Sequence, residues 1–236
     1  LATLGLIAAM LLTIGGRAVW GRLLAARPTQ GLARVGPYRL ELEIGGGGMG
    51  QVYRARHDLL ERPTAVKVMR PEHATPSAYR RFEREVQFAC QLRHPNTVSI
   101  YDYGRAADGR FYYVMEYLTG VNLQHLVEMF GPLPPARVLY LLRQICGSLG
   151  EAHAAGWVHR DIKPQNIMVC NCGGATDFVK VLDFGLVKPM EPGPGESEPT
   201  LGEWVGTPKY MAPERLLQPK LADARGDIYS VGVTLY

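Results

Sequence analysis

The chain has 236 residues, 47% of them hydrophobic and 20% charged, which allows a sizeable buried core and indicates a globular protein. Its net charge of +4 comes from residues 1–37, which hold four of the 26 basic residues and no acidic one, so the other 22 balance the 22 acidic residues. A nucleic-acid-binding function therefore has no electrostatic support.

The first 16 residues are uncharged and largely apolar, and Arg17, Arg22 and Arg27 follow them. A secretory signal has the opposite order, with its charged region first. Sixteen helical residues span about 24 Å, less than the roughly 30 Å of a bilayer core, but the chain begins with Leu, so the apolar run can continue upstream. We expect residues 1–26 to form a transmembrane or membrane-proximal helix that keeps the following region in the cytoplasm, with an amphipathic or buried helix as the alternative. Residues 27–37 are predicted to be a linker.

A glycine-rich segment carries the pattern G-x-G-x-x-G-x-V at Gly45, Gly47, Gly50 and Val52. Glycines let a backbone approach phosphate groups closely, and a dinucleotide-binding turn shares the first part of this pattern. However, the alternating residues Gln51 to Ala55 predict a strand after the glycines, where a dinucleotide-binding turn has a helix. This disfavours a dinucleotide site.

Two apolar stretches predict further strands. Ala65 to Val68 is one of them and contains Lys67, for which a solvent-facing position on an edge strand is an equally good interpretation of the tetrapeptide alone. Phe111 to Leu118 is the other and runs into a connector. On sequence alone, its Met115 is an ordinary core residue.

A helix is predicted to begin at Thr75 and Pro76, because Thr is a good N-cap and Pro is favoured at the first helical position. Its apolar face consists of residues at helical spacing: Phe82, Val86 and Ala89 or Cys90. Glu85 lies on this helix among several arginines, so a solvated charge is its ordinary interpretation. Glu83 is the rival candidate for any ion-pair role.

The segment His159–Asn166 combines a base, a cation and a metal ligand within eight residues. Phosphoryl transfer needs a carboxylate such as Asp161 to accept or orient a hydroxyl, a lysine such as Lys163 to neutralise phosphate charge, and an amide such as Asn166 to hold Mg²⁺. A second carboxylate, Asp183, follows an apolar run that predicts a strand. Carboxylate oxygen is the hard ligand that Mg²⁺ prefers.

Four cysteines are present, at Cys90, Cys146, Cys170 and Cys172. The single C-x-C pair makes a poor zinc site without a second pair. Cys170 to Gly174 instead predict a hairpin turn between strands that end at Val169 and begin near Phe178. We take the thiols as reduced, as in the cytosol.

The stretch Pro189–Glu203 has four prolines, three glycines and four acidic residues among its 15 positions, too little apolar surface to order itself. Its only hydroxyl residues are Ser197 and Thr200. After it come Trp204–Glu214, which ends in Ala-Pro-Glu, and Asp227–Gly232.

Taken in order, these motifs resemble those of the eukaryotic-like (Hanks-type) protein kinases over Tyr38–Tyr236, and most of all the bacterial membrane-linked serine/threonine branch. The resemblance implies an α+β, two-lobed fold, with a small β-rich lobe at about 38–115 and a larger helical lobe at 116–236. The family's later helices, with the Arg that pairs with Glu214, are expected beyond Tyr236, so we expect a fragment of a longer protein.

The resemblance also implies the roles of individual residues. Asp161 is the base or hydroxyl orienter and Lys163 stabilises the transferring phosphate, as in serine/threonine-specific enzymes. Asn166 and Asp183 bind Mg²⁺ or Mn²⁺. The ATP-binding residues are implied to be Ile44, Gly45, Gly47, Gly50, Val52, Ala65, Lys67, Glu85 (which pairs with Lys67), Met115, Glu116, Leu118 and Met168. The regulatory residues are implied to be Arg160, Ser197, Thr200 and Thr207. Asp227 is implied to brace the backbone of the segment His159–Asn166, which we call the catalytic loop.

The expected function is transfer of the ATP γ-phosphate to Ser or Thr hydroxyl groups of proteins in bacterial signalling. Autophosphorylation is expected at Thr200, which lies seven residues before Thr207, with Ser197 secondary. The expected partners are ATP, protein substrates, the membrane and a second copy of the chain for phosphorylation in trans. Two alternatives remain: a catalytically inert pseudokinase scaffold and an ATP-binding sensor module.

Overall fold

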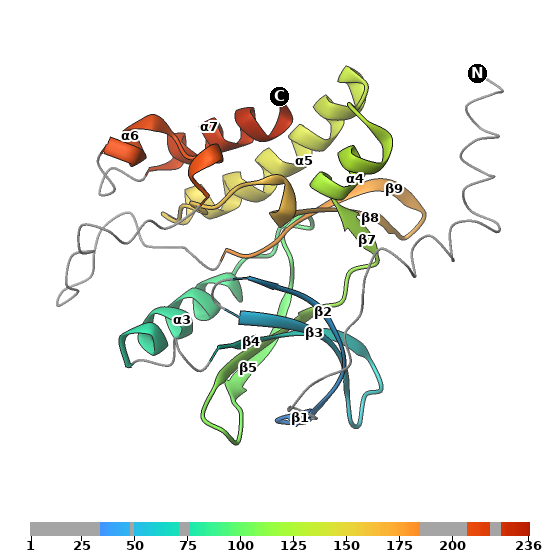
Figure 1. Ribbon diagram of the computed structural model, residues 1–236, viewed down its shortest axis with the longest axis vertical. Coiled ribbons are helices and arrows are strands. Elements are labelled where there is room, and N and C mark those ends of the chain that lie inside the picture. The colour runs from blue at the N-terminus through green and yellow to red at the C-terminus, as the bar shows by residue number, and fades with distance from the viewer. Residues whose placement is uncertain (1–33, 48–49, 71–75, 185–206, 218–222) are drawn as a thin grey trace. The chain divides into compact units, whose positions relative to one another are not determined.

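The computed structural model describes residues 34–47, 50–70, 76–184, 207–217 and 223–236 (Figure 1). The chain divides into two compact units, Leu1–Ala74 with Gly104–Val114 and Thr75–Tyr103 with Met115–Tyr236. The first is built on a β-sheet and the second is mainly helical, which is the α+β composition that we predicted. Helix α3 (Pro76–Ala89) falls in the second unit, whereas the predicted small lobe includes it. The predicted lobe and linker boundaries remain predictions.

Several predicted features lie outside the described residues. They are the membrane-associated segment 1–26, residues 27–33 of the linker, and Ser197 and Thr200. Within the ranges that the structure describes, no helix is both long and apolar enough to cross a membrane.

A six-stranded sheet in the order β1-β2-β3-β4-β6-β5 forms the framework of the first unit. The strands are β1 (Arg34–Val35), β2 (Tyr38–Gly47), β3 (Gly50–His57), β4 (Pro63–Met69), β5 (Ile100–Arg105) and β6 (Phe111–Glu116). The three strands predicted around Gln51–Ala55, Ala65–Val68 and Phe111–Leu118 are therefore confirmed, and the last of them ends at Glu116.

The core of the first unit lies on one face of this sheet. Side chains alternate between the two faces of a strand, so residues two positions apart share a face. Val66 and Val68 of β4 are 0% and 2% exposed and belong to one buried cluster with Tyr53 and Ala55 of β3. The opposite face of the same two strands therefore carries the alternate residues, which include Lys67.

The second unit contains helices α3, α4 (Leu123–Phe130), α5 (Pro135–Ala154), α6 (Pro213–Leu217) and α7 (Ala224–Leu235). It also contains the short 3-10 turns η2 (Pro164–Asn166) and η3 (Pro208–Tyr210) and a three-stranded sheet, β7 (Gly120–Asn122), β8 (Ile167–Cys172) and β9 (Ala175–Val181). Helix α3 begins at Pro76, as predicted. Side-chain caps begin two others: Asn122 accepts a hydrogen bond from the backbone of His125 at the start of α4, and Asp223 does the same for Arg225 at the start of α7.

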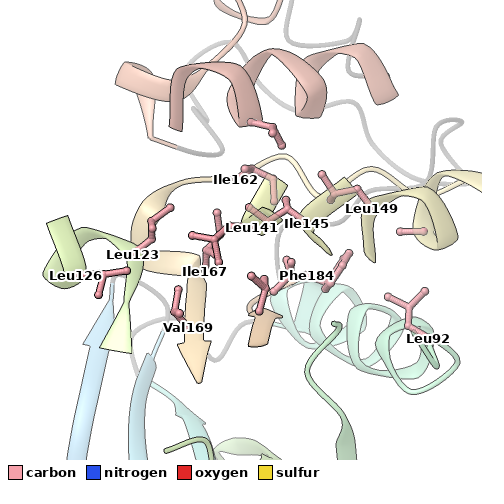
Figure 2. Packing of buried hydrophobic residues seen from close by; sticks show 14 of the residues in the cluster. Leu92, Leu123, Leu126, Leu141, Ile145, Leu149, Ile162, Ile167, Val169 and Phe184 are labelled. Carbon is pink, nitrogen blue, oxygen red and sulfur yellow. The ribbon is translucent and has the colours of Figure 1, made fainter. Parts of the chain in front are cut away.

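The core of the second unit is organised by helix α5. Leu141, Ile145 and Leu149 recur every four residues, so they form one stripe along the helix, and all three are 0% exposed. They belong to the same cluster as Ile167 of β8 (Figure 2). Val181 of β9 is a further member of this cluster. Burying each such aliphatic side chain contributes about 1.5–3 kcal/mol to stability. Because α5 and β8 share this core, the segment between them is held at both ends.

The predicted hairpin between β8 and β9 is confirmed, with strands longer than expected. Cys172 pairs with Ala175, so the turn contains only Gly173 and Gly174. Their φ angles of 57° and 84° are those that a tight two-residue hairpin turn requires and that glycine adopts without strain. Because the turn is so short, β8 extends to Cys172 and β9 begins at Ala175, where we had placed the strand ends at Val169 and Phe178.

Candidate active site

The predicted catalytic residues lie on the segment between α5 and β8. The Asp161 carboxylate lies 2.6 Å from Lys163 Nζ, and the two side chains are 10% and 21% exposed. A third residue joins them from the distant segment before η3: the Thr207 hydroxyl accepts a hydrogen bond from Lys163 Nζ at 2.9 Å and donates one to Asp161 Oδ1 at 3.2 Å. The structure thus brings a carboxylate, an ammonium group and a hydroxyl into mutual contact.

Asn166 attaches to the same group through its side chain. Its Nδ2 donates to the Asp161 backbone carbonyl at 2.8 Å and to Asp161 Oδ2 at 3.1 Å. The backbone carbonyl of Asn166 accepts a hydrogen bond from the amide of Leu182 at 2.8 Å, immediately before Asp183. Because the amide nitrogen faces Asp161, the amide oxygen points the other way.

Asp183 follows the end of β9 with a φ of 51°, a region that non-glycine residues seldom adopt. The next residue, Phe184, is buried and lies with its ring centroid 4.6 Å from that of His159. His159 in turn is hydrogen-bonded through Nε2 to the carbonyl of Leu182 at 2.9 Å. These contacts tie the backbone on either side of Asp183 to the catalytic loop.

An oxygen-only donor pair, the Asn166 amide and the Asp183 carboxylate, suits Mg²⁺ or Mn²⁺, which prefer hard oxygen ligands. The backbone link between Leu182 and Asn166 connects the segments that carry both donors. Among the residues described here, no group of three or more His, Cys, Asp or Glu side chains could hold a metal ion.

The side chain of Asp227, on α7, binds the backbone of the catalytic loop, as predicted. Its two carboxylate oxygens accept hydrogen bonds from the amides of His159 at 2.7 Å and Arg160 at 2.8 Å. His153 Nε2 lies 2.9 Å from the same carboxylate, a contact that our sequence analysis missed. Burial opposes ionisation of this carboxyl, but the His153 hydrogen bond, the electrostatic interaction with His159 and the two amides together hold the pKa of Asp227 below its ordinary value.

Arg160, the predicted phosphate receptor, is 9% exposed and has a φ of 68°. Burial and the neighbouring charge of Arg215 lower the pKa of Arg160 to about 10. Arg215 was not among the predicted site residues, although its guanidinium reaches the carbonyl of Arg160 at 2.8 Å. No signal in the sequence marks it, since it resembles any helix-surface arginine.

In the first unit, several predicted nucleotide-binding residues share one face of the sheet. Val52 pairs with both Gly45 and Lys67 across antiparallel strands, and directly opposed residues project from the same face. Ala65 lies two positions before Lys67 and so joins them. Ile44 precedes these glycines on β2. The Lys67 ammonium lies 5.9 Å from the ring centroid of Tyr113, a contact at cation–π distance.

The glycines of this segment differ in what surrounds them. A Cβ on Gly45 would meet no atom of the described residues within 4 Å, so that part of the chain leaves the space open. A Cβ on Gly50 would lie 2.5 Å from the carbonyl oxygen of Val68, so this glycine is required by the close approach of β3 to β4. In the β2–β3 hairpin, Gly45 therefore borders open space, whereas Gly50 is packed against β4. For Gly47, only the backbone is described.

The predicted adenine-facing connector belongs to the second unit. Met115 and Glu116 end β6, and Leu118 follows; Met115 is 7% exposed. The Glu116 side chain lies 2.6 Å from Lys180 Nζ, and it also accepts a hydrogen bond from the amide of Ser99 at 2.8 Å.

The Glu116–Lys180 pair, 18% and 10% exposed, was not predicted. The sequence places Lys180 within the apolar stretch Phe178–Val181, which could have indicated a buried pair. A lysine that faces solvent gives the same sequence pattern. Met168 lies opposite Lys180 in the β8–β9 register and so shares its face of the sheet. Lys180 is thus a neighbour of both predicted residues, across the strands for Met168 and through its ammonium for Glu116. The backbone of Glu85 lies in α3, but its side chain is outside the described set.

Comparison with known proteins agrees with this geometry. Residues 38–236 match the family model "Protein kinase domain". The serine/threonine-protein kinase pkn3 of Myxococcus xanthus is 43% identical over 205 residues, which cover 84% of this chain and 37% of that protein. PknB of Mycobacterium tuberculosis is 41% identical over 203 residues, with 84% and 32% covered. The chain therefore spans about a third of the length of these relatives.

A solved structure supports the same assignment. The crystal structure of the Mycobacterium tuberculosis PknI kinase domain aligns with a TM-score of 0.65 at 29% identity, covering 89% of this chain and 76% of that one. The fold is thus the two-lobed kinase fold that we predicted, with a β-rich and a helical lobe. By sequence and by structure, the chain belongs to the protein kinase family.

Proposed function

We propose that the intact protein is a serine/threonine protein kinase that transfers the γ-phosphate of ATP to Ser or Thr hydroxyl groups of other proteins. The observation that carries this proposal is the contact group of Asp161, Lys163 and Thr207, with Asn166 attached to it. Its relatives pkn3 and PknB are named serine/threonine-protein kinases, which agrees with the proposal.

Each residue of the group has a task in this reaction. Asp161 accepts or orients the proton of the attacking hydroxyl, because it is the carboxylate at the centre of the group. Lys163 lies against it and neutralises charge on the transferring phosphoryl group. The Thr207 hydroxyl contacts both and restrains their orientation. The hydroxyl oxygen of the substrate Ser or Thr then forms a bond to the γ-phosphorus of ATP. The bond between the γ-phosphorus and the β-phosphate oxygen breaks, and ADP leaves.

Asn166 and Asp183 are proposed to hold Mg²⁺ or Mn²⁺ through their side-chain oxygens. When bound, the ion neutralises phosphate charge. The hydrogen bonds from Asn166 Nδ2 to Asp161 support this assignment, because they fix the amide so that its oxygen faces away from the carboxylate.

ATP is proposed to bind the remaining predicted residues. Gly45, Val52, Ala65 and Lys67 share one face of the first sheet, and the open space at Gly45 suits a phosphate or ribose close to the backbone. Lys67 would grip phosphates and Glu85 would pair with it. The residues proposed to surround the nucleotide further are Ile44, Gly47, Gly50, Met115, Glu116, Leu118 and Met168.

Regulation is proposed to act through Arg160, with autophosphorylation of Thr200 and secondarily of Ser197. A phosphate on that segment supplies the negative charge that a buried arginine attracts. The geometry of Thr207 supports a position within the catalytic group in addition to any regulatory role. Mass spectrometry of the ATP-treated protein tests the sites. Unmodified Ser197 and Thr200 in an active sample, or full activity of the double alanine variant, contradicts the mechanism.

Two proposals concern the cellular setting. The apolar residues 1–16 and the arginines after them support a membrane anchor that leaves the kinase domain on the cytoplasmic side. Association of two copies would allow phosphorylation in trans. Fractionation of cells that express the intact protein, with and without residues 1–26, tests the anchor. Equal recovery of both forms in the soluble fraction would contradict it.

Two other functions have less support. A pseudokinase scaffold lacks one of the catalytic groups in most cases, whereas Lys67, Asp161, Asn166 and Asp183 are all present here. A nucleotide-binding sensor would bind ATP without a protein acceptor. Transfer of labelled phosphate to a protein substrate separates both of them from the kinase.

The decisive variant is Asp161→Asn in the intact protein. It keeps the shape of the side chain and removes the proton acceptor, so we expect ATP binding to persist while turnover falls by roughly 10²–10⁴-fold. Asp108→Asn is the matched control, since Asp108 pairs with Arg110 in an exposed turn. Asp161→Asn transferring phosphate as fast as the wild type would sink the proposal.

A further inference from the structure

Arg215 of α6 is a buried arginine that reaches the catalytic loop. It is 6% exposed, and its Nη1 donates to the backbone carbonyl of Arg160 at 2.8 Å. A Cβ on Gly226 of α7 would lie 3.3 Å from Arg215 Cδ, so the absence of a side chain there leaves room for the arginine stem. The stem therefore crosses α7 at a glycine on its way to the loop.

Burial of a guanidinium requires compensation, and the surroundings supply it. Burial lowers the pKa of Arg215, while the carboxylates of Asp227, Asp161 and Glu214 act in the opposite direction. Asp227 is the residue that holds the amides of the catalytic loop, and Asp161 is the proposed base. The positive charge of Arg215 is thus stabilised by Asp227 and Asp161, which also belong to the site.

The backbone of Arg160 needs restraint, because its φ of 68° is a left-handed conformation that is strained for a non-glycine residue. Two contacts supply it. The Arg160 amide donates to Asp227 at 2.8 Å, and its carbonyl accepts from Arg215 at 2.8 Å.

The peptide group that joins Arg160 to Asp161 determines where the proposed base begins. Its carbonyl is that of Arg160, held by Arg215, and its N–H is that of Asp161, which donates to His159 Nδ1 at 3.3 Å. The plane of this peptide sets the direction in which the Asp161 side chain leaves the backbone. Loss of the stronger of the two contacts would free the peptide to rotate.

We infer that Arg215 is a positioning residue, which orients Asp161 for phosphoryl transfer by holding the carbonyl of Arg160. The inference rests on the proposed kinase function. It makes α6 a support of the active site, and it distinguishes Arg215 from an arginine that only packs α6 against α7. Only the positioning role requires the donated hydrogen bond; packing requires only the aliphatic stem.

The test uses the intact protein with three substitutions. Arg215→Met keeps the stem and removes the donor, Arg215→Lys keeps stem, charge and a donor, and Arg225→Met is the control, because Arg225 is an exposed arginine near the start of α7 that pairs with Asp223. We expect kcat of Arg215→Met to fall roughly 10–100-fold, since misplacement of a reacting group by about 1 Å costs that much. The KM for ATP should change by less than about twofold, because Arg160 and Asp161 act in transfer and not in nucleotide binding. Arg215→Lys should recover only part of kcat, because its ammonium ends one bond short of the Nη1 position. Arg225→Met should match the wild type.

Two results overturn the inference. One is an unchanged kcat in Arg215→Met beside an active wild type. The other is a kcat loss of the same size in Arg215→Met and Arg225→Met at a temperature where both are folded, because Arg225 makes no contact with the Arg160 carbonyl in the described structure.

A second measurement does not depend on activity. Hydrogen exchange of the amides of Arg160 and Asp161 should be faster in Arg215→Met than in the wild type and in Arg225→Met, because the peptide between them is released. Equal exchange in all three proteins contradicts positioning. The wild type could bind ATP and transfer no phosphate, while Arg215→Met still shows faster exchange at Arg160 and Asp161. This result would reject the kinase proposal and retain the role of Arg215 in holding the peptide before Asp161.

Discussion

Lys163 and Thr207 are 44 residues apart in the chain and in direct contact, with the Lys163 ammonium donating to the Thr207 hydroxyl at 2.9 Å. The same hydroxyl donates to Asp161 at 3.2 Å. One threonine therefore connects the segment before α6 to both charged groups of the catalytic loop. A residue in its place that lacks the hydroxyl would remove the contact at Asp161 Oδ1 and leave the carboxylate held by Lys163 and Asn166 at Oδ2.

This contact predicts a difference between two substitutions of Thr207. Thr207→Val keeps the shape and removes the hydroxyl, so kcat should fall about tenfold to a hundredfold through loss of orientation. Thr207→Ser keeps the hydroxyl and should stay close to the wild type. Steady-state kinetics on a protein substrate measures both. Equal rates for the valine and serine variants would show that the hydroxyl is not needed.

The Glu116–Lys180 pair predicts strong coupling in stability. Because the side chains are 18% and 10% exposed, Lys180→Met leaves a carboxylate poorly solvated and should lower the free energy of unfolding by about 3–5 kcal/mol. Glu116→Gln should also destabilise, whereas the double variant should recover most of the loss. Urea unfolding of the four proteins gives the coupling energy.

The exposed pair Arg225–Asp223 is the matched control for that cycle. Its side chains are 88% and 41% exposed, so its coupling should be about 0–1 kcal/mol. Equal coupling in the two pairs would mean that burial does not strengthen the Glu116–Lys180 interaction.

Asp227 predicts a dependence of stability on acidity. The pKa of its carboxyl is lower in the folded than in the unfolded state, where it is about 3.9. Its contribution is therefore complete above the unfolded value and is lost as the pH falls through the folded value. Asp227→Asn should lower the free energy of unfolding by about 2–3 kcal/mol at neutral pH. The difference from the wild type should narrow below about pH 4.

Denaturant titrations at several pH values measure this trend. His153→Gln is a useful companion, because it weakens one of the hydrogen bonds that hold the Asp227 pKa down. A gap between wild type and Asp227→Asn that stays constant across the acid range would contradict the ionised, hydrogen-bonded carboxylate.

The two glycines of the β2–β3 hairpin predict opposite outcomes. Gly50→Ala places a Cβ 2.5 Å from the Val68 carbonyl and should reduce stability. The Cβ of Gly45→Ala meets no atom within 4 Å in the part of the chain that the structure describes, so the melting temperature should stay nearly unchanged. If the open space accommodates ATP, the same variant should raise the KM for ATP several-fold, roughly 3–10-fold. Thermal melts and ATP titrations separate the two effects, and a Gly45→Ala variant with a lowered melting temperature and normal KM would reverse the assignment.

The sequence by itself determined the local motifs and the strands that carry them. Alternation over Gln51–Ala55 predicted β3, the apolar stretch Ala65–Val68 predicted β4, and Thr75-Pro76 predicted the start of α3. The spacing of Asp161, Lys163 and Asn166 marked the catalytic loop, because residues within one short segment stay close however the rest of the chain packs. The bracing role of Asp227 came from the family resemblance, and the hydrogen bonds to His159 and Arg160 confirm it.

Only the tertiary structure decided which distant side chains complete that loop. Thr207 meets Lys163 across 44 positions, Arg215 meets Arg160 across 55, and Lys180 meets Glu116 across 64. Hydrophobic periodicity reports which side of a helix or strand is buried, and it carries no information on which polar group lies opposite. These contacts depend on strand register and on the packing of α6 and α7 beside the loop, so each looks like an ordinary surface charge or hydroxyl until the chain is folded.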